Sequence, residues 1–199
     1  MGVVAALLCI GLGQQAAFGA DGGTATAAIR GTVNEVIRIL ENDDLKGPER
    51  ASERREQIVT IVKARFDFKE MSKRTLGRHW RKLNDDQRRE FVRLFTALLA
   101  TSYAKKMDGY SDERVEYLSE RTKKNFAEVK TKVRSGKVEI PLDYRLLKNS
   151  DDWRVYDVVV DGVSLVRNYR GQFSKVIKSS SYEDLVVTLR EKISPSRAP

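Results

Sequence analysis

Apolar residues recur three or four positions apart through the first half of the chain, which predicts helices with one buried face. The predicted helices run from Ile29 to Leu40, from Glu53 to Phe66 with a continuation to Gly77, and from Asn84 to near Gly109. The third has the clearest start, because Asn84 and Gln87 have the spacing of a reciprocal helix cap. Gly47-Pro48 separates the first helix from the second.

From about residue 115 the apolar residues occur at every second position, as expected of strands. The predicted strands are Val115 to Ser119, Ala127 to Val133, Val138 to Leu146 and Trp153 to Val160. The second and third alternate apolar and polar residues on either side of Ser135-Gly136, which predicts a hairpin with one apolar face. The fourth is apolar at most positions, which predicts a central strand covered on both sides.

Helical spacing returns after Gly162, from Ser164 to Ile177 and from Tyr182 to Ile193. Gly162 lies where the chain leaves the sheet and turns back toward a helix, and such a turn favours a residue that tolerates positive φ. The order of helices, antiparallel meander and helices, without a repeat or a long linker, predicts an α+β fold. We expect one domain over residues 29–193 and a frayed tail over 194–199.

The N-terminal segment is interpreted as a targeting signal. Residues 1–19 carry no charged side chain and end in Ala17-Phe18-Gly19, a pattern of small residues typical of signal-peptide cleavage. The strongest apolar stretch, Val3 to Leu12, is shorter than the roughly 20 residues that cross a bilayer. We therefore expect a signal peptide over 1–19 and a flexible joint over 20–28.

Composition narrows the chemistry. The 199 residues include 37 Lys and Arg against 28 Asp and Glu, which gives a net charge of +9, and they contain a single Cys and a single His. A positive surface favours anionic partners such as phosphate groups or a lipid headgroup surface. A lone His makes no ordinary zinc site, so we expect no metal and no cofactor. The basic residues are interleaved with acidic ones and accompany no groove-reading motif, which argues against nucleic acid.

Catalytic groups are scarce in the sequence, which holds no G-x-S-x-G, H-E-x-x-H, P-loop or Cys-His pair. No set of residues therefore supplies a nucleophile, a base and an oxyanion site together, and we expect no enzyme. A lipid hydrolase would need Ser164 as nucleophile, with Asp157 and His79 as helpers. His79 suits a packing or solvated role better. Asp157, in the most apolar strand, requires either bonding partners or a function.

The apolar side chains of the Asn84 helix and of the sheet are expected to face one volume. If that volume is open, it forms an apolar ligand pocket; if it is filled, the chain is an interaction module that docks on an anionic membrane or protein. The residues expected to line the pocket are Phe91, Phe95, Leu98, Val133, Ile140, Leu142, Tyr144, Val158 and Val160.

A series of short segments between Val33 and Ile193 matches a known family in order and spacing. The segments are Phe66-Asp67-Phe68 with Met71, Leu76-Gly77-Arg78-His79-Trp80, Gln87 with Phe91 and Phe95, Leu98-Leu99 with Tyr103, Val155-Tyr156-Asp157-Val158, Asp161-Gly162-Val163-Ser164-Leu165-Val166, and Asn168-Tyr169-Arg170 with Phe173. In these segments the chain resembles the MlaC, or toluene-tolerance, family of periplasmic phospholipid-binding proteins, which includes the hopanoid-associated HpnM branch.

The resemblance implies a cone-like fold, with helices packed on a four-stranded antiparallel sheet around an apolar pocket that holds acyl chains. It implies a periplasmic carrier of glycerophospholipid that maintains outer-membrane lipid asymmetry. Its partners would be an inner-membrane ABC transporter complex and an outer-membrane lipoprotein complex, with the carrier itself a monomer. A hopanoid or another hydrophobic compound is the alternative cargo.

A carrier must approach membranes and membrane complexes repeatedly and then leave, which calls for long-range attraction with modest final affinity. The basic residues considered for this docking role are Arg78, Arg81, Lys82, Lys130 and Lys132. Solubility alone is the alternative role for each of them.

Overall fold

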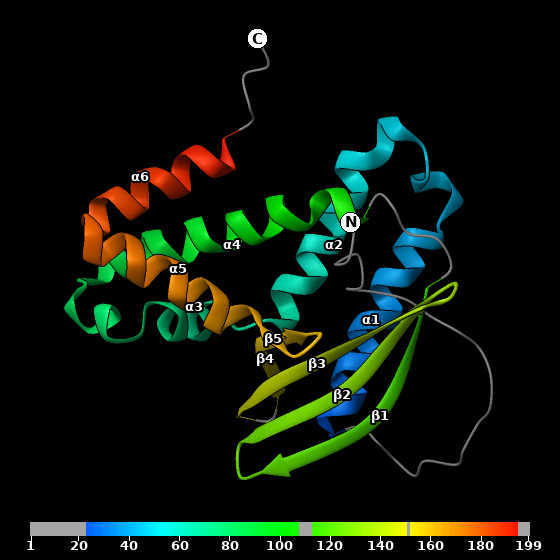
Figure 1. Cartoon of the computed structure of the whole chain (residues 1–199). Coiled ribbons are helices and arrows are strands. Elements are labelled where there is room, and N and C mark those ends of the chain that lie inside the picture. The colour runs from blue at the N-terminus through cyan, green and yellow to red at the C-terminus, as the bar shows by residue number, and fades with distance from the viewer. Residues whose placement is uncertain (1–22, 108–112, 151, 195–199) are drawn as a thin grey trace.

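The computed structural model describes residues 23–107, 113–150 and 152–194 (Figure 1). The predicted signal peptide over 1–19, the helix end near Gly109 and the tail after residue 194 lie outside these ranges. Of the joint predicted over 20–28, residues 25–28 are helical, because the first helix begins at Ala25, where the Thr24 hydroxyl accepts a hydrogen bond from the Ala27 N–H. No helix in the described ranges is both long and apolar enough to cross a membrane.

The described residues form six α-helices, three short 3₁₀ helices and five strands. The α-helices are α1 (Ala25–Glu41), α2 (Ala51–Arg65), α3 (Phe68–Leu76), α4 (Asp85–Met107), α5 (Leu165–Ser179) and α6 (Tyr182–Ile193). The 3₁₀ helices are η1 (Asp43–Leu45), η2 (Pro48–Arg50) and η3 (Gly77–Lys82). The strands are β1 (Arg114–Lys123), β2 (Phe126–Ser135), β3 (Val138–Asn149), β4 (Asp152–Val160) and β5 (Val163–Ser164).

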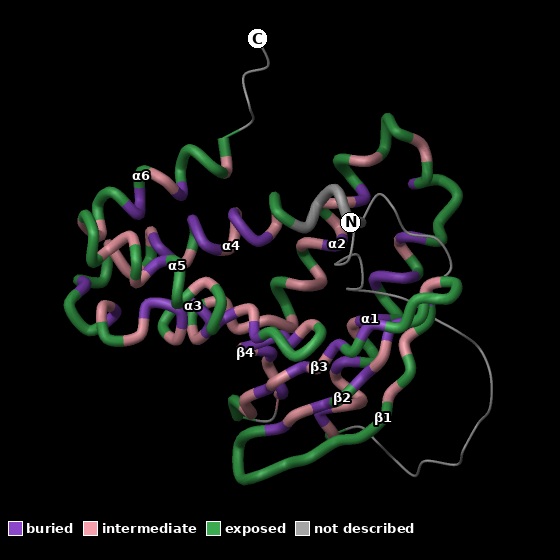
Figure 2. The backbone as a smooth tube through the Cα atoms, viewed as in Figure 1, coloured by how far each residue is buried: buried purple, intermediate pink, exposed green. Residues whose placement is uncertain are grey.

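One face of the sheet packs against α1 (Figures 1 and 2). The sheet is antiparallel and follows chain order, β1-β2-β3-β4-β5. The sheet cluster is the set of buried apolar side chains between α1 and the strands: Ala25, Ile29, Val33, Ile37, Ala127, Val129, Val133, Ile140, Leu142, Tyr144, Leu146, Trp153, Val155 and Val158. Each large side chain buried here contributes roughly 1.5–3 kcal/mol, so this contact fixes α1 on the sheet.

A second layer, made of α3, η3, α4, α5 and α6, lies beside the β4 end of the sheet (Figure 1). The helical cluster is its buried apolar core: Met71, Leu76, Trp80, Leu83, Phe91, Leu94, Phe95, Leu98, Leu99, Val166, Phe173, Leu185, Val186 and Leu189. The rings of Phe91 and Phe95 each meet that of Phe173 edge-on at 5.8 Å between centroids. Phe66 packs against both clusters and so lies at the junction between the two layers.

The helix predicted from Glu53 to Gly77 is interrupted, and the sequence prediction is wrong on this point. Phe66 forms a parallel bridge with Val155, and the Asp67 N–H donates to the Val155 carbonyl at 2.8 Å. The Asp67 carboxylate then accepts the Glu70 N–H at 2.8 Å and caps α3. The N-cap at Asp67 and the pairing with β4 outweigh the continuous apolar spacing. As a result α2 ends at Arg65 and a new helix, α3, begins at Phe68.

The reciprocal cap predicted at the start of α4 is confirmed. The Asn84 N–H donates to Gln87 Oε1 at 3.0 Å, and the Gln87 N–H donates to Asn84 Oδ1 at 2.9 Å. These two bonds satisfy backbone donors that a helix start leaves without partners.

β4 is buried on both faces as predicted, but its place in the sheet differs from the prediction. It is the last long strand, flanked by β3 on one side and by the two-residue β5 on the other. An irregularity in the β3–β4 register places Arg145 opposite Asp157 and Leu146 opposite Val155, so Tyr156 is the extra residue of a bulge. Val155 and Val158 face α1 in the sheet cluster, whereas Tyr156 packs against the helical cluster.

The α+β class with helices packed on an antiparallel sheet is confirmed, and the strand count differs from the prediction by the short β5. Gly162 does not lead directly into a helix. Asp161 and Gly162 form a two-residue turn between β4 and β5, with φ of 48° and 76°. Positive φ at both central residues is the signature of a tight hairpin turn that favours the Asp-Gly sequence.

We predict that Gly162→Val lowers the free energy of unfolding by more than about 1 kcal/mol, because a β-branched residue fits poorly at positive φ. Chemical denaturation measures the change. Gly31→Val is the matched control, since Gly31 lies in α1 at ordinary helical φ and has open space where a side chain would begin. We expect it to leave stability within about 0.5 kcal/mol of wild type. Equal effects of the two variants would show that the Asp161-Gly162 turn imposes no special requirement.

Candidate functional site

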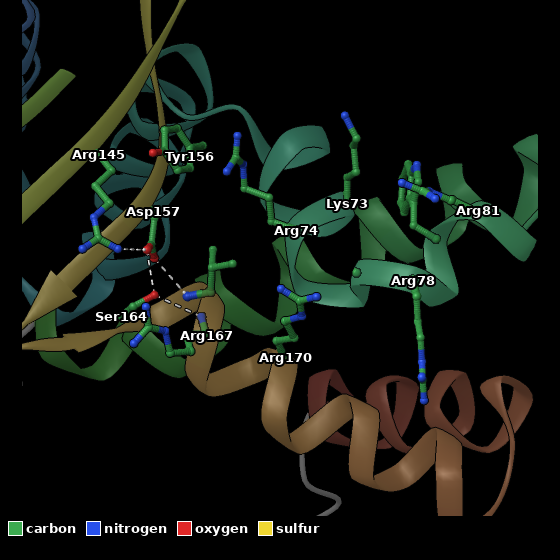
Figure 3. A pocket seen from close by; sticks show the side chains of 13 residues that line it. Lys73, Arg74, Arg78, Arg81, Arg145, Tyr156, Asp157, Ser164, Arg167 and Arg170 are labelled. Carbon is green, nitrogen blue, oxygen red and sulfur yellow. Dashed lines mark hydrogen bonds and ion pairs between the residues drawn. The ribbon is translucent and has the colours of Figure 1, made fainter. Parts of the chain in front are cut away.

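A pocket of about 670 Å³ opens where α3, η3 and α5 meet β3 and β4 (Figure 3). It is lined by Lys73, Arg74, Gly77, Arg78, Trp80, Arg81, Arg145, Tyr156, Asp157, Ser164, Val166, Arg167 and Arg170. We call this site the basic pocket. Its volume lies within the range of about 300–1,000 Å³ that small-molecule pockets occupy.

Positive charge dominates the basic pocket, because seven of its lining residues are Lys or Arg and one, Asp157, is acidic. Three of the seven are paired. Lys73 and Arg74 contact Glu70 at 3.3 and 2.9 Å. Arg145 contacts Glu128 and Asp157 at 3.3 and 3.2 Å. The positive charge of the opening therefore comes mainly from the other four arginines.

Asp157 is the polar centre of the pocket wall, with only 4% of its surface exposed. Its Oδ2 accepts the Ser164 hydroxyl at 2.7 Å and Arg145 Nη1 at 3.2 Å. Its Oδ1 accepts the Val166 N–H at 3.0 Å, at the start of α5 (Figure 3). The carboxylate therefore has the backbone and arginine partners that its burial requires.

A catalytic triad does not form around Ser164. Its hydroxyl donates to Asp157 and accepts the Arg167 N–H at 3.0 Å, so it serves as the N-cap of α5. His79, the single His of the chain, does not line the basic pocket. Burial, followed by the nearby charges of Arg78, Lys82 and Lys178, lowers the pKa of His79. Among the described residues no group of three or more His, Cys, Asp or Glu side chains is placed to hold a metal ion.

The nine residues predicted to line one apolar pocket are divided between two places. Phe91, Phe95 and Leu98 belong to the helical cluster. Val133, Ile140, Leu142, Tyr144 and Val158 belong to the sheet cluster, with Val160 packed against it. None of the nine lines the basic pocket. α1 covers the apolar face of the sheet, and α4 packs with α3, α5 and α6 instead. That these nine residues contact lipid stays a prediction.

The predicted docking residues are also divided. Arg78 and Arg81 line the basic pocket, and Lys82 follows them at the end of η3. Lys130 and Lys132 lie on β2, where strand alternation directs them away from the buried Val129 and Val133. Lys132 forms an ion pair with Glu139 at 2.8 Å, so its positive charge has a partner within the protein.

Sequence reasoning missed Lys73, Arg74, Arg145, Arg167 and Arg170 as members of a site. The sequence did contain a signal for some of them. Arg74 and Arg78 are four residues apart, Arg78 and Arg81 are three apart, and Arg167 and Arg170 are also three apart. Such spacing places side chains on one side of a helix. Arg145 had no comparable signal, because its position opposite Asp157 depends on the β3–β4 register.

Comparison with known proteins identifies a family and relatives of known name. Residues 30–191 match the family model described as MlaC protein. A Haemophilus influenzae protein named intermembrane phospholipid transport system binding protein MlaC is 24% identical over 127 residues, which are 61% of this chain. The match spans 59% of that relative's length.

A solved structure extends the comparison to the fold. It is the phospholipid-binding protein from Ralstonia solanacearum in complex with a phospholipid, 27% identical to this chain, with a TM-score of 0.75. The match covers 85% of this chain and 97% of that one.

We predict that Asp157→Asn lowers the free energy of unfolding by about 2–4 kcal/mol, because a neutral amide cannot accept all three bonds and leaves Arg145 without its buried partner. Asp143→Asn is the matched control on the adjacent strand β3. Burial raises the pKa of Asp143, so its charge is disfavoured in the fold. Denaturation of both variants at neutral pH measures the difference. A loss no larger for Asp157→Asn than for Asp143→Asn would contradict the central role of Asp157.

Proposed function

Because this chain belongs to the MlaC protein family, we propose that it is a phospholipid-binding carrier rather than an enzyme. The observation that carries the proposal is the likeness, over nearly the whole length of the solved structure, to a protein in complex with a phospholipid. The engagement of Ser164 as a helix cap agrees with a binding role, as does a pocket lining that does not include His79.

The proposed position of the acyl chains is the junction between the sheet cluster and the helical cluster. Phe66 packs against both clusters, and Tyr156 lies between the helical cluster and the basic pocket. An acyl chain inserted there would separate the clusters and contact the predicted apolar residues from two sides. The driving force is large, because each buried CH₂ group contributes about 0.8 kcal/mol.

The proposed cellular role follows from the family and from the N-terminal segment. The uncharged residues 1–19 direct export to the periplasm, where the carrier moves glycerophospholipid between an inner-membrane transporter complex and an outer-membrane lipoprotein complex. This transfer maintains the lipid asymmetry of the outer membrane. The name of the Haemophilus influenzae relative supports intermembrane transport.

We predict that the purified protein takes up phospholipid from vesicles of phosphatidylethanolamine and phosphatidylglycerol. Native mass spectrometry of the protein from a gentle purification should show bound lipid, and incubation with labelled vesicles should transfer label to the protein fraction. A folded protein that carries no lipid from cells and takes up none from vesicles would refute the carrier proposal. Uptake of a hopanoid in preference to phospholipid would instead identify the alternative cargo.

The docking surface of the proposed carrier is the basic segment at η3 and the adjoining end of α5. Burial and, after it, the positive charges of Arg78, Lys82 and Lys178 lower the pKa of His79, so these three charges lie in one region. Lys82 and Lys178 do not line the basic pocket. They are therefore suited to attract an anionic membrane or protein surface without contacting the cargo.

We predict that lipid transfer to anionic vesicles slows steeply as salt is raised from low to physiological levels, because the Debye length falls from about 30 Å to about 8 Å. The double variant Lys82→Glu, Lys178→Glu should transfer lipid more slowly at low salt while it retains bound lipid. The control Arg38→Glu, Lys63→Glu makes the same change in net charge at exposed positions on α1 and α2. Equal rates for the two double variants would show that net charge, and not this surface, determines docking.

A further inference from the structure

Four arginines of the basic pocket have no acidic partner. In the described part of the chain, Arg78, Arg81, Arg167 and Arg170 form no ion pair, although Lys73, Arg74 and Arg145 beside them are paired. They come from two elements, η3 and α5, that face each other across the opening (Figure 3). Unpaired like charges around one concavity repel one another unless an anion lies between them.

The stability of α5 does not explain its two arginines. Arg167 lies in the first turn, where a positive charge opposes the helix dipole. The N–H groups of Val166 and Arg167 at this helix end already donate to Asp157 and Ser164. The free donors at this end of the pocket are therefore the guanidinium groups and not the helix backbone.

Gly77 leaves room for one of these arginines to lie against the backbone. It has a φ of 56°, and a Cβ at this position would lie 2.7 Å from Nη2 of Arg170. Without a side chain at residue 77, the Arg170 guanidinium lies directly against the backbone at the start of η3. A positioned guanidinium loses less conformational freedom when it binds a ligand.

The aromatic faces of the pocket are not free for a choline group. Arg74 lies over the Tyr156 ring at 4.0 Å from its centroid, and Arg88 lies over the Trp80 ring at 5.7 Å. Asp157, the single carboxylate of the lining, is used by Arg145, Ser164 and Val166. A quaternary ammonium would therefore meet cations, with neither an aromatic cage nor an acidic partner.

We propose that the basic pocket binds the phosphate of a lipid headgroup through Arg78, Arg81, Arg167 and Arg170, and that it selects headgroups of net negative charge over phosphocholine. Guanidinium groups bind phosphate oxygens through paired, charge-assisted hydrogen bonds. Trp80 and Val166 belong to both the pocket lining and the helical cluster, so the wall of the basic pocket changes from charged to apolar at these residues. A lipid, whose charged headgroup is joined to apolar acyl chains, requires such a change. This selectivity rests on the proposed carrier function.

The test uses short-chain dihexanoyl phosphatidylglycerol and dihexanoyl phosphatidylcholine, each below the concentration at which it forms micelles. Isothermal titration should show wild type binding the anionic lipid at least about tenfold more tightly than the choline lipid. The double variant Arg167→Gln, Arg170→Gln should lose this preference to within about twofold, because its affinity for the anionic lipid falls more than its affinity for the choline lipid. Thermal denaturation checks that the variant is folded.

The matched control is the double variant Arg38→Gln, Arg93→Gln, which removes the same charge from exposed positions on α1 and α4. It should keep the wild-type preference. A wild type that binds both lipids equally, or a control that loses the preference as fully as the pocket variant, would overturn the proposal.

Inorganic phosphate separates a headgroup site from a site for free phosphate. If the anionic lipid binds at least about tenfold more tightly than inorganic phosphate, the ligand is the headgroup of an amphiphile. Equal affinity of inorganic phosphate for the same arginines would assign the pocket to free phosphate and overturn the headgroup proposal. Failure to take up lipid from vesicles refutes the carrier proposal separately, because the titration with short-chain lipid requires no extraction from a membrane.

Discussion

The two layers of this protein depend on one buried carboxylate. Asp157 lies at the bulge in β4 and accepts hydrogen bonds from Arg145 of β3, from Ser164 of β5 and from the first turn of α5. It thereby joins the sheet to the helix that carries the second layer. A charge buried to this extent is stable only while all of these partners stay in place, so the geometry of the junction is narrowly defined.

This arrangement also determines the electrostatics of the basic pocket. Asp157 neutralises part of the charge of Arg145 and accepts a hydrogen bond from the backbone of α5. Among the described residues it forms no ion pair with the arginines of η3 and α5. The pocket holds one acidic lining residue for seven basic ones, and its positive potential is not cancelled locally. The same interaction that holds the layers together therefore leaves the opening between them attractive to anions.

Local chemistry predicted most of the elements but not their arrangement. The cap formed by Asn84 and Gln87 involves residues three apart, and the Ser135-Gly136 hairpin depends on a turn sequence, so both are visible in the chain. The break at Phe66-Asp67 depends on the Asp67 cap and on pairing with Val155, about ninety residues away, and the local pattern does not report that pairing. For the same reason Asp157 was recognised as unusual from its apolar neighbours, whereas its partner Arg145 was not.

The division of the apolar residues between two clusters could not be predicted from the sequence. An amphipathic helix and an amphipathic sheet each have one buried face, but periodicity does not state which faces meet. Here α1 covers the sheet, and α4 packs with α3, α5 and α6 instead. Phe66 packs against both clusters and so marks the junction between the two cores, where we propose that the acyl chains bind. Acyl chains bound at this junction, as proposed above, would contact side chains of both clusters, so the binding and release of cargo would be coupled to the packing of the two layers against each other.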